Sequence, residues 1–167
     1  MKTIAITGHR KLSNEDEVRQ NITLSLQYFQ SLDKDLLAIS ALAVGADTIF
    51  AQEAIKLNIP VRYVLPFDLM EYEKDFSPSE LEVMRDLLAQ NEQKYEVASF
   101  LKDSNPDTRN EAYLVVGKHL VDECDVLLAV WDGQVAKGKG GTGDVVAYAR
   151  TQGKELHIVN VHGGDFC

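Results

Sequence analysis

Short apolar segments alternate with longer amphipathic segments along the sequence, and this alternation constrains the fold more than any other feature. A short apolar run is typical of a strand buried in a parallel sheet. A stripe of apolar residues every three to four positions is typical of a helix packed on that sheet. The alternation therefore predicts βαβ units and an α/β fold of three layers, α/β/α, around a mostly parallel central sheet.

The predicted helices fill the segments between the predicted strands. We predict strands over residues 3–7, 36–40, 61–65, 95–98, 126–131 and 156–161, and helices over residues 14–31, 45–57, 78–93, 107–124 and 142–151. Ser13 and Asp16 are spaced like a capping box at the first helix. Residues 126–130 are apolar throughout, as a strand covered on both faces must be, so we expect them at the sheet centre. This order of elements predicts a Rossmann-like domain.

Length, charge and cysteine content narrow the classes of protein. A chain of 167 residues with 45% hydrophobic residues fits one domain, residues 1–167. The net charge of -9 disfavours nucleic acid and anionic membranes as partners, and no apolar run is long enough for a signal peptide or a membrane span. Two cysteines, Cys124 and Cys167, do not make a secreted disulfide framework. We therefore expect a soluble, cytoplasmic protein.

A glycine-rich loop over residues 138–143 carries the strongest functional signal. Glycine stands at positions 138, 140, 141 and 143, and the loop leads directly into the last predicted helix. Backbone N–H groups of such a loop can converge on a phosphate, while the helix dipole adds positive potential. We predict phosphate contacts from Gly140, Gly141 and Thr142, with Thr142 also able to act as the helix N-cap. The loop matches neither a Walker A motif nor a dinucleotide fingerprint, and we predict no cofactor.

Ligand-capable residues also follow the first two predicted strands, where ligands bind in open parallel sheets. Gly8 permits close backbone approach, His9 can exchange protons, and Arg10 can hold phosphate; the alternative is a plain turn with a solvated arginine. Gly45 and Asp47 open the second helix, whose N-terminus attracts an anion. Asp47 equally suits a carboxylate that only stabilises the first helical turn.

Three further segments could contribute to a site, and two of them have a second interpretation. Trp131, Asp132 and Gly133 end the fifth predicted strand, beside the glycine-rich loop, and we include them in the site. Arg109 lies near the start of a predicted helix, where it either contacts ribose or phosphate or is a surface residue. The polar connection over residues 67–77 is either a lid or a plain loop.

No residue pattern indicates a metal site. The histidines at 119, 157 and 162 lack the spacing of metal ligands, and neither cysteine lies in a C-x-x-C pair. We therefore predict no metal.

Four motifs in order resemble the SLOG superfamily: TGHR after the first strand, AVGAD after the second, AVWDG at the fifth, and GKGGTGDVVAYA into the last helix. That group includes cytokinin-activating phosphoribohydrolases, a DNA-processing Rossmann domain and stand-alone sensors of nucleotide derivatives. The chain is similar, more distantly, to nucleoside 2-deoxyribosyltransferases. The resemblance implies a Rossmann-like fold, a nucleotide-derived ligand and a homo-oligomer, dimer or tetramer.

The resemblance also identifies a departure at the catalytic position. The related enzymes carry a glutamate three residues after the threonine of the G-T pair, where this chain has Val145. Asp144 is the neighbouring carboxylate, but one residue along a helix is a rotation of about 100°. A catalytic role would therefore need Asp144 or another nearby carboxylate in place of the glutamate, with His9 or Arg10 assisting the leaving group or the phosphate.

Three functions remain open. The first is binding or sensing of a nucleotide derivative, such as a nucleoside phosphate or an ADP-ribose type of molecule, with its sugar near Asp132 and Arg109. The second is hydrolysis or transfer of an N-glycosidic bond. The third is a structural or partner-binding subunit in which the glycines form a flexible loop. The DNA-processing function ranks below the first two, because the charge of the chain disfavours it.

Overall fold

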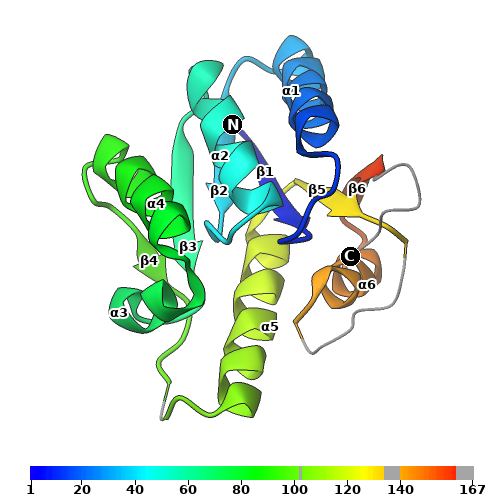
Figure 1. The fold of residues 1–167 in the computed structure, drawn as a ribbon. Coiled ribbons are helices and arrows are strands. Elements are labelled where there is room, and N and C mark those ends of the chain that lie inside the picture. Colours follow the sequence, from blue (N-terminus) through cyan, green and yellow to red (C-terminus); the bar gives the residue numbers. More distant parts are fainter. Residues whose placement is uncertain (102, 134–139, 161–167) are drawn as a thin grey trace.

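A single parallel sheet lies at the centre of the computed structural model, which describes residues 1–101, 103–133 and 140–160 (Figure 1). Its strand order is β4-β3-β2-β1-β5-β6, and every described pair of neighbouring strands is parallel. The predicted three-layer α/β fold is therefore confirmed. The strands are β1 (Lys2–Gly8), β2 (Leu36–Ser40), β3 (Val61–Leu65), β4 (Glu96–Val97), β5 (Val126–Trp131) and β6 (Glu155–Asn160).

The middle of the sheet is formed by β2 and β1, not by the strand expected there. β5 lies between β1 and β6, one place from the end of the sheet. It is nevertheless buried from Val126 to Val130, because helices cover both of its faces. An apolar strand sequence therefore indicates cover on two faces, but it does not give the position in the sheet.

The helices divide between the two faces of the sheet (Figure 1). α1, α2 and α4 bury their apolar residues on one face, and α5 and α6 bury theirs on the other. This is the arrangement that right-handed crossovers between parallel strands produce. The long helices are α1 (Glu15–Leu32), α2 (Ala46–Lys56), α4 (Pro78–Gln90), α5 (Pro106–Glu123) and α6 (Thr142–Thr151).

Helix starts differ from the expected ones at two places. Asn14, not Ser13, is the N-cap of α1, and a capping box forms at α4, between Ser77 and Glu80. Gly141, not Thr142, is the N-cap of α6, and Thr142 is the first residue of the helix. An extended backbone at a glycine can serve as an N-cap, so a nearby hydroxyl residue does not fix the position.

The connection over residues 67–77 contains two short helical segments, α3 (Leu69–Tyr72) and η1 (Glu73–Asp75). Tyr72 is fully buried, and its hydroxyl donates to the carbonyl oxygen of Ala41 at 3.0 Å. Its ring packs edge-on against Phe67 and Phe76. The connection is thus attached to the core through an aromatic side chain.

The remaining element boundaries agree closely with the sequence pattern. The strand predicted over 95–98 is shortened to Glu96–Val97, and the last strand spans Glu155–Asn160. Residue 161, predicted as its final residue, lies outside the described part of the chain. The helix predicted to run to 93 ends at Gln90. Glu92 and Gln93 have positive φ, which stops a right-handed helix.

Candidate functional site

The strand order reverses between β1 and β5, and this point is where ligands bind in open parallel sheets. From β1 the chain crosses through α1 to β2, and from β5 it crosses through α6 to β6 on the other side. The loops after β1 and β5 therefore leave the sheet side by side. We call the described residues at this position the switch-point site: Gly8, His9, Asp132, Gly140, Gly141 and Thr142.

His9 joins the two loops of the switch-point site. Its Nε2 accepts a hydrogen bond from the backbone N–H of Asp132 at 3.2 Å and lies 3.4 Å from Asp132 Oδ1. The side chains are 16% and 3% exposed. An Nε2 atom that accepts this bond places the imidazole proton on Nδ1, whereas a protonated ring would form an ion pair with the carboxylate. The pair can thus bind hydroxyl groups or exchange a proton.

Gly8 and Gly45 are required for close packing beside this pair. A Cβ atom on Gly8 would lie 2.4 Å from Ala46 Cβ. Gly45 has φ +87°, and a Cβ there would lie 2.5 Å from the carbonyl oxygen of His9 and 2.4 Å from that of Arg10. The start of α2 therefore rests directly on the turn that follows β1.

The polar groups in the first turn of α2 form hydrogen bonds within the protein. Ala46 donates its N–H to the carbonyl oxygen of His9 at 3.2 Å. Asp47 is buried, and one of its oxygens accepts the N–H of Ala43 at 3.3 Å. Burial raises the pKa of Asp47 to about 7, although the Ala43 hydrogen bond and the charge of Arg10 oppose the shift. These contacts favour the structural interpretation of Asp47.

Arg109 forms a buried charge cluster with acidic residues of α3 and η1. The guanidinium is 14% exposed, pairs with Glu71 and with Asp75 Oδ2 at 2.6 Å, and stacks over the Phe67 ring at 4.5 Å. The Tyr113 hydroxyl donates to the same Asp75 oxygen. Arg109 therefore holds α3 and η1 against α5. The sequence did not indicate this pairing, because the partners lie more than thirty residues away.

Arg10 approaches the same cluster from the other side. Its guanidinium stacks over the Tyr113 ring at 4.6 Å. Burial alone would lower the pKa of Arg10, but neighbouring Tyr113 raises it above its usual value. The side chain is thus held as a cation between α5 and the start of α2.

The described part of the glycine-rich loop is ordered against α5. Gly138 lies outside the described residues, whereas Gly140 has φ +85° and approaches the α5 backbone so closely that a Cβ would lie 2.7 Å from the nitrogen of Leu114. Asp144 accepts the N–H of Gly140 at 2.9 Å. The Asp144 carboxylate, which was considered for catalysis, therefore holds the end of the loop against the first turn of α6.

Val145, at the position of the related enzymes' glutamate, points into the core. It is 3% exposed and belongs to the apolar cluster between α5, α6 and the sheet. A Cβ on Gly117 of α5 would lie 2.6 Å from its Cγ2 atom. A carboxylate at this position would have to displace helix packing before it reached a ligand.

Trp131 and Gly133 complete the predicted set at the end of β5. The Trp131 ring lies under the guanidinium of Arg150, 5.5 Å from the ring centroid. Gly133 has φ +82°, and a Cβ there would meet no atom within 4 Å. Gly133 thus provides a turn rather than a close contact.

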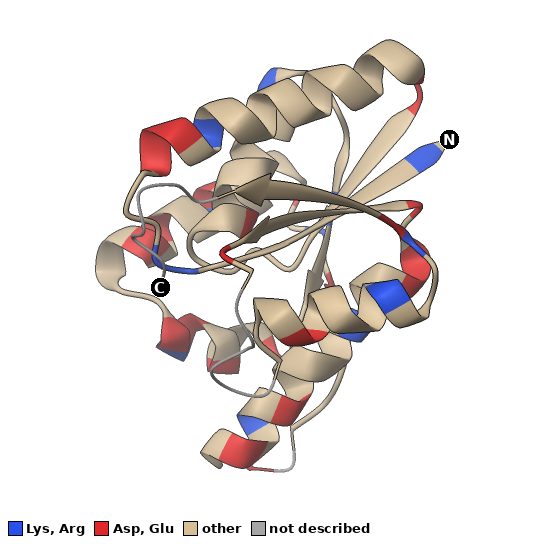
Figure 2. Cartoon of the chain, turned by 90° about the vertical axis from the view of Figure 1, so that its right-hand side faces the viewer, with Lys and Arg blue, Asp and Glu red and all other residues tan. Residues whose placement is uncertain are grey.

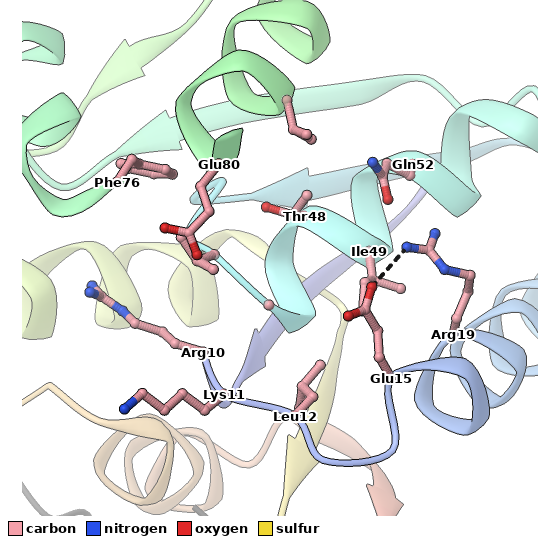
Figure 3. Close-up of a pocket in the computed structure, with 13 residues that line it drawn as sticks. Arg10, Lys11, Leu12, Glu15, Arg19, Thr48, Ile49, Gln52, Phe76 and Glu80 are labelled. Atoms are coloured by element: carbon pink, nitrogen blue, oxygen red, sulfur yellow. Dashed lines mark ion pairs between the residues drawn. The ribbon is translucent and has the colours of Figure 1, made fainter. Parts of the chain in front are cut away.

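A groove of about 440 Å³ opens beside the start of α2, between α1 and α4 (Figure 3). Arg10 and Lys11 lie toward one end of it and Gln52 and Arg19 toward the other. Apolar side chains and the carboxylates of Glu15 and Glu80 line the groove between them. Its volume lies within the range of small-molecule sites, roughly 300–1,000 Å³. Arg10 and Gly45 were expected at a site; Lys11, Arg19, Thr48 and Gln52 were not.

One signal in the sequence could have found part of this groove. Thr48 and Gln52 are one helical turn apart in an otherwise largely apolar segment, so they form a polar stripe on α2. Arg19 and Lys11 come from other elements. Their arrival at the groove depends on how α1 and α2 pack.

Three chemical features bear on the function classes. Among the described residues, no group of three His, Cys, Asp or Glu side chains could hold a metal ion. In the same part of the chain, no helix combines the length and apolarity needed to cross a membrane. Cys124 is buried, which raises the pKa of its thiol to about 11 and makes it a poor nucleophile.

Comparison with known proteins gives a likeness of fold. No protein-family model and no curated protein matches the chain. DNA processing protein A (DprA) from Streptococcus pneumoniae matches 99% of this chain over 52% of its own, with 16% identity and a TM-score of 0.63. The structural-genomics target TM1055 matches 93% of this chain over 72% of its own, with 18% identity and a TM-score of 0.54.

The chain thus spans about half the length of the DprA chain that it matches. At identities of 16% and 18%, the comparison establishes a similar backbone fold and says nothing of the active sites. The chain therefore has a DprA-like Rossmann fold, as its resemblance to the SLOG superfamily predicts.

Proposed function

We propose that this domain binds a nucleotide-derived small molecule, of the nucleoside phosphate or ADP-ribose type, at the carboxyl ends of β1 and β5. The observation that carries the proposal is the position of the glycine-bounded N-terminus of α6, which follows β5 at the point where the strand order reverses. Helix N-termini in this position bind phosphate in many α/β proteins.

The phosphate would lie on the first turn of α6. The N–H groups of Thr142 and Gly143 occupy positions that have no acceptor within an α-helix. Gly141 has an extended backbone, φ -69° and ψ 172°, and brings no side chain between the helix end and a ligand. The hydroxyl of Thr142 can add a donor to the same anion.

The sugar of the ligand and any further phosphate groups would lie toward β1. The His9 and Asp132 pair offers an imidazole and a carboxylate for ribose hydroxyl groups. Arg10 follows directly and faces the groove with Lys11, so additional phosphate or an extended ligand finds cations there. Arg109 is left out of the proposed site, because Glu71 and Asp75 already hold it.

A small ligand suits the charge of the domain better than a nucleic-acid strand. Acidic residues outnumber basic ones by 26 to 17, and Figure 2 shows both kinds scattered over the helices without a basic stripe. Binding of single strands normally needs a continuous basic groove. The DNA processing named for DprA is therefore not part of the proposal.

The proposal is limited to binding because the geometry gives hydrolysis little support. Asp144 is engaged by the N–H of Gly140, and Val145 is packed against Gly117. Cleavage of an N-glycosidic bond would need another carboxylate at the ligand. Release of free base from nucleoside monophosphates, measured by chromatography, would reveal such an activity.

Thermal denaturation with a ligand panel tests the proposal. The panel contains nucleoside mono-, di- and triphosphates, ADP-ribose, inorganic phosphate and a single-stranded oligonucleotide. A ligand at a hundred times its Kd stabilises the fold by about 2.7 kcal/mol, which raises the melting temperature of a domain this size by about 5–10 °C. The proposal fails if no nucleotide shifts the melting temperature or if only the oligonucleotide does.

Matched variants assign the effect to the loop. Valine at position 141 is compatible with the backbone of Gly141 and fills the approach to the helix end, so Gly141→Val should abolish the shift. Thr151→Val lies at the opposite end of α6 and should preserve it. A shift that survives Gly141→Val would move the ligand away from this loop.

A further inference from the structure

The outer surface of α1 exposes an unusual row of apolar side chains. Leu24, Tyr28 and Leu32 are 55%, 54% and 61% exposed. They are spaced four residues apart, so they form one stripe along the helix. We call these three residues the α1 stripe.

No charged residue accompanies the stripe on its part of the helix. Residues 20–32 contain no Asp, Glu, Lys or Arg, and Figure 2 shows the middle of α1, at the top, without either colour. The exposed face of a helix in a globular protein is normally charged. A surface that lacks charged residues and exposes aromatic and leucine side chains is typical of the core of a protein interface.

Contacts on the sheet side hold Tyr28 in place. Its ring stacks on His157 of β6, with centroids 6.5 Å apart, and meets Phe29 edge-on at 5.1 Å. His157 in turn lies 3.2 Å from the hydroxyl of Ser25. The exposed ring is thus pre-ordered, so binding to it costs less side-chain entropy.

The order of side chains in the stripe identifies the occupant. Leu24 and Leu32 lie one step either side of Tyr28, so the stripe reads the same in both directions along α1. A two-fold axis through Tyr28 places two antiparallel copies of α1 together, with each Leu24 against the Leu32 of the partner. Such self-matching is what an isologous interface requires.

The stripe supplies about half of the area that the smallest stable interface buries, and the rest must come from the residues around it. The three side chains expose roughly 300 Å² on one copy, which is the size of the largest apolar patch on a typical monomer. Two copies would bury about twice that area, and a stable interface buries about 1,200–2,000 Å² in total. The uncharged polar residues beside the stripe supply the rim: Gln20, Gln27 and Ser31.

We infer that the α1 stripe is the centre of a two-fold interface between two copies of this chain, with the helices antiparallel. The inference does not depend on the proposed ligand, because none of its residues belongs to the switch-point site or the groove. Antiparallel helices also set their dipoles in a favourable arrangement.

Light scattering after size exclusion tests the inference with charge-swapped variants. The wild-type chain should have twice the chain mass at micromolar concentration. Leu24→Lys combined with Leu32→Lys should give the chain mass, because each lysine would face a lysine of the partner. Leu24→Glu combined with Leu32→Glu should do the same. An equimolar mixture of the two should recover the doubled mass, because lysine then faces glutamate.

Controls distinguish a lost interface from a lost fold. Circular dichroism and a cooperative melting transition should be retained in both double variants, because the substituted positions are exposed. Met70→Lys changes a side chain that is 78% exposed on α3 and should leave the doubled mass intact. A wild-type chain that stays monomeric overturns the inference, and so do double variants that remain dimeric. A mixture that stays monomeric would overturn the antiparallel pairing.

Discussion

Substitution of Gly45 tests the packing that brings the turn after β1 against the start of α2. Gly45 has φ +87° and ψ -124°, a conformation that side-chain-bearing residues avoid at a cost of about 1–3 kcal/mol. An added Cβ would also lie 2.4 Å from the carbonyl oxygen of Arg10, so two backbone segments must separate. Overpacking of this kind costs about 1–3 kcal/mol. We expect Gly45→Ala to lower the free energy of unfolding by about 4 kcal/mol in total.

Gly153→Ala separates the two contributions. Gly153 also has positive φ, +66°, but an added Cβ meets no atom within 4 Å. It should therefore cost only the conformational part, about 1–2 kcal/mol. Urea denaturation measures both values, and the melting temperature should fall by about 2–4 °C for each kcal/mol. Equal losses for the two variants would refute the close approach of the turn to α2.

Three further variants test buried groups. Burial raises the pKa of Asp47 from 3.8 to about 7, so the folded state keeps a proton that the unfolded chain releases, and wild-type stability should fall between these pH values. In Asp47→Asn, the midpoint of urea denaturation should fall less with pH over this range. A variant with the same pH profile as the wild type would contradict the raised pKa of Asp47. Tyr72→Phe removes the hydrogen bond to Ala41 and should cost about 1–3 kcal/mol in the same assay, whereas a loss near zero would contradict that bond. Val145→Glu should destabilise by about 3 kcal/mol or more without creating base release, because the carboxylate enters the packing against Gly117; a stable, active variant would disprove this placement.

Local patterns explain why the elements of this fold were predictable. A strand such as β5 is recognisable because each of its residues is buried, and a helix such as α6 because its apolar residues follow a helical period. The position of β5 in the sheet depends on which strands pair. Pairing is a property of the whole sheet, so the expected centre was displaced by one strand.

The candidate site was predictable where residues follow the ends of β1 and β5, because a parallel sheet brings these ends together, and His9 and Asp132 meet there. Gly45 and Gly140 were predicted as site residues because they precede helix N-termini, and the structure gives both a positive φ and a close approach to neighbouring backbone. The role of Arg109 was not found, because Glu71 and Asp75 reach it across the fold. Arg19 was not predicted for the same reason, because it reaches the groove only through the packing of α1 against α2.

Backbone amide shifts during ligand titration test the central claim most directly. Nitrogen-15 spectra would be recorded as ADP-ribose or a nucleoside monophosphate is added, with inorganic phosphate as the reference. The account predicts the largest shifts at Thr142 and Gly143, with smaller ones at His9 and Asp132, and their loss in Gly141→Val. Saturable shifts confined to the groove residues Thr48 and Gln52, or no shifts at all, would contradict the assignment of phosphate binding to the N-terminus of α6.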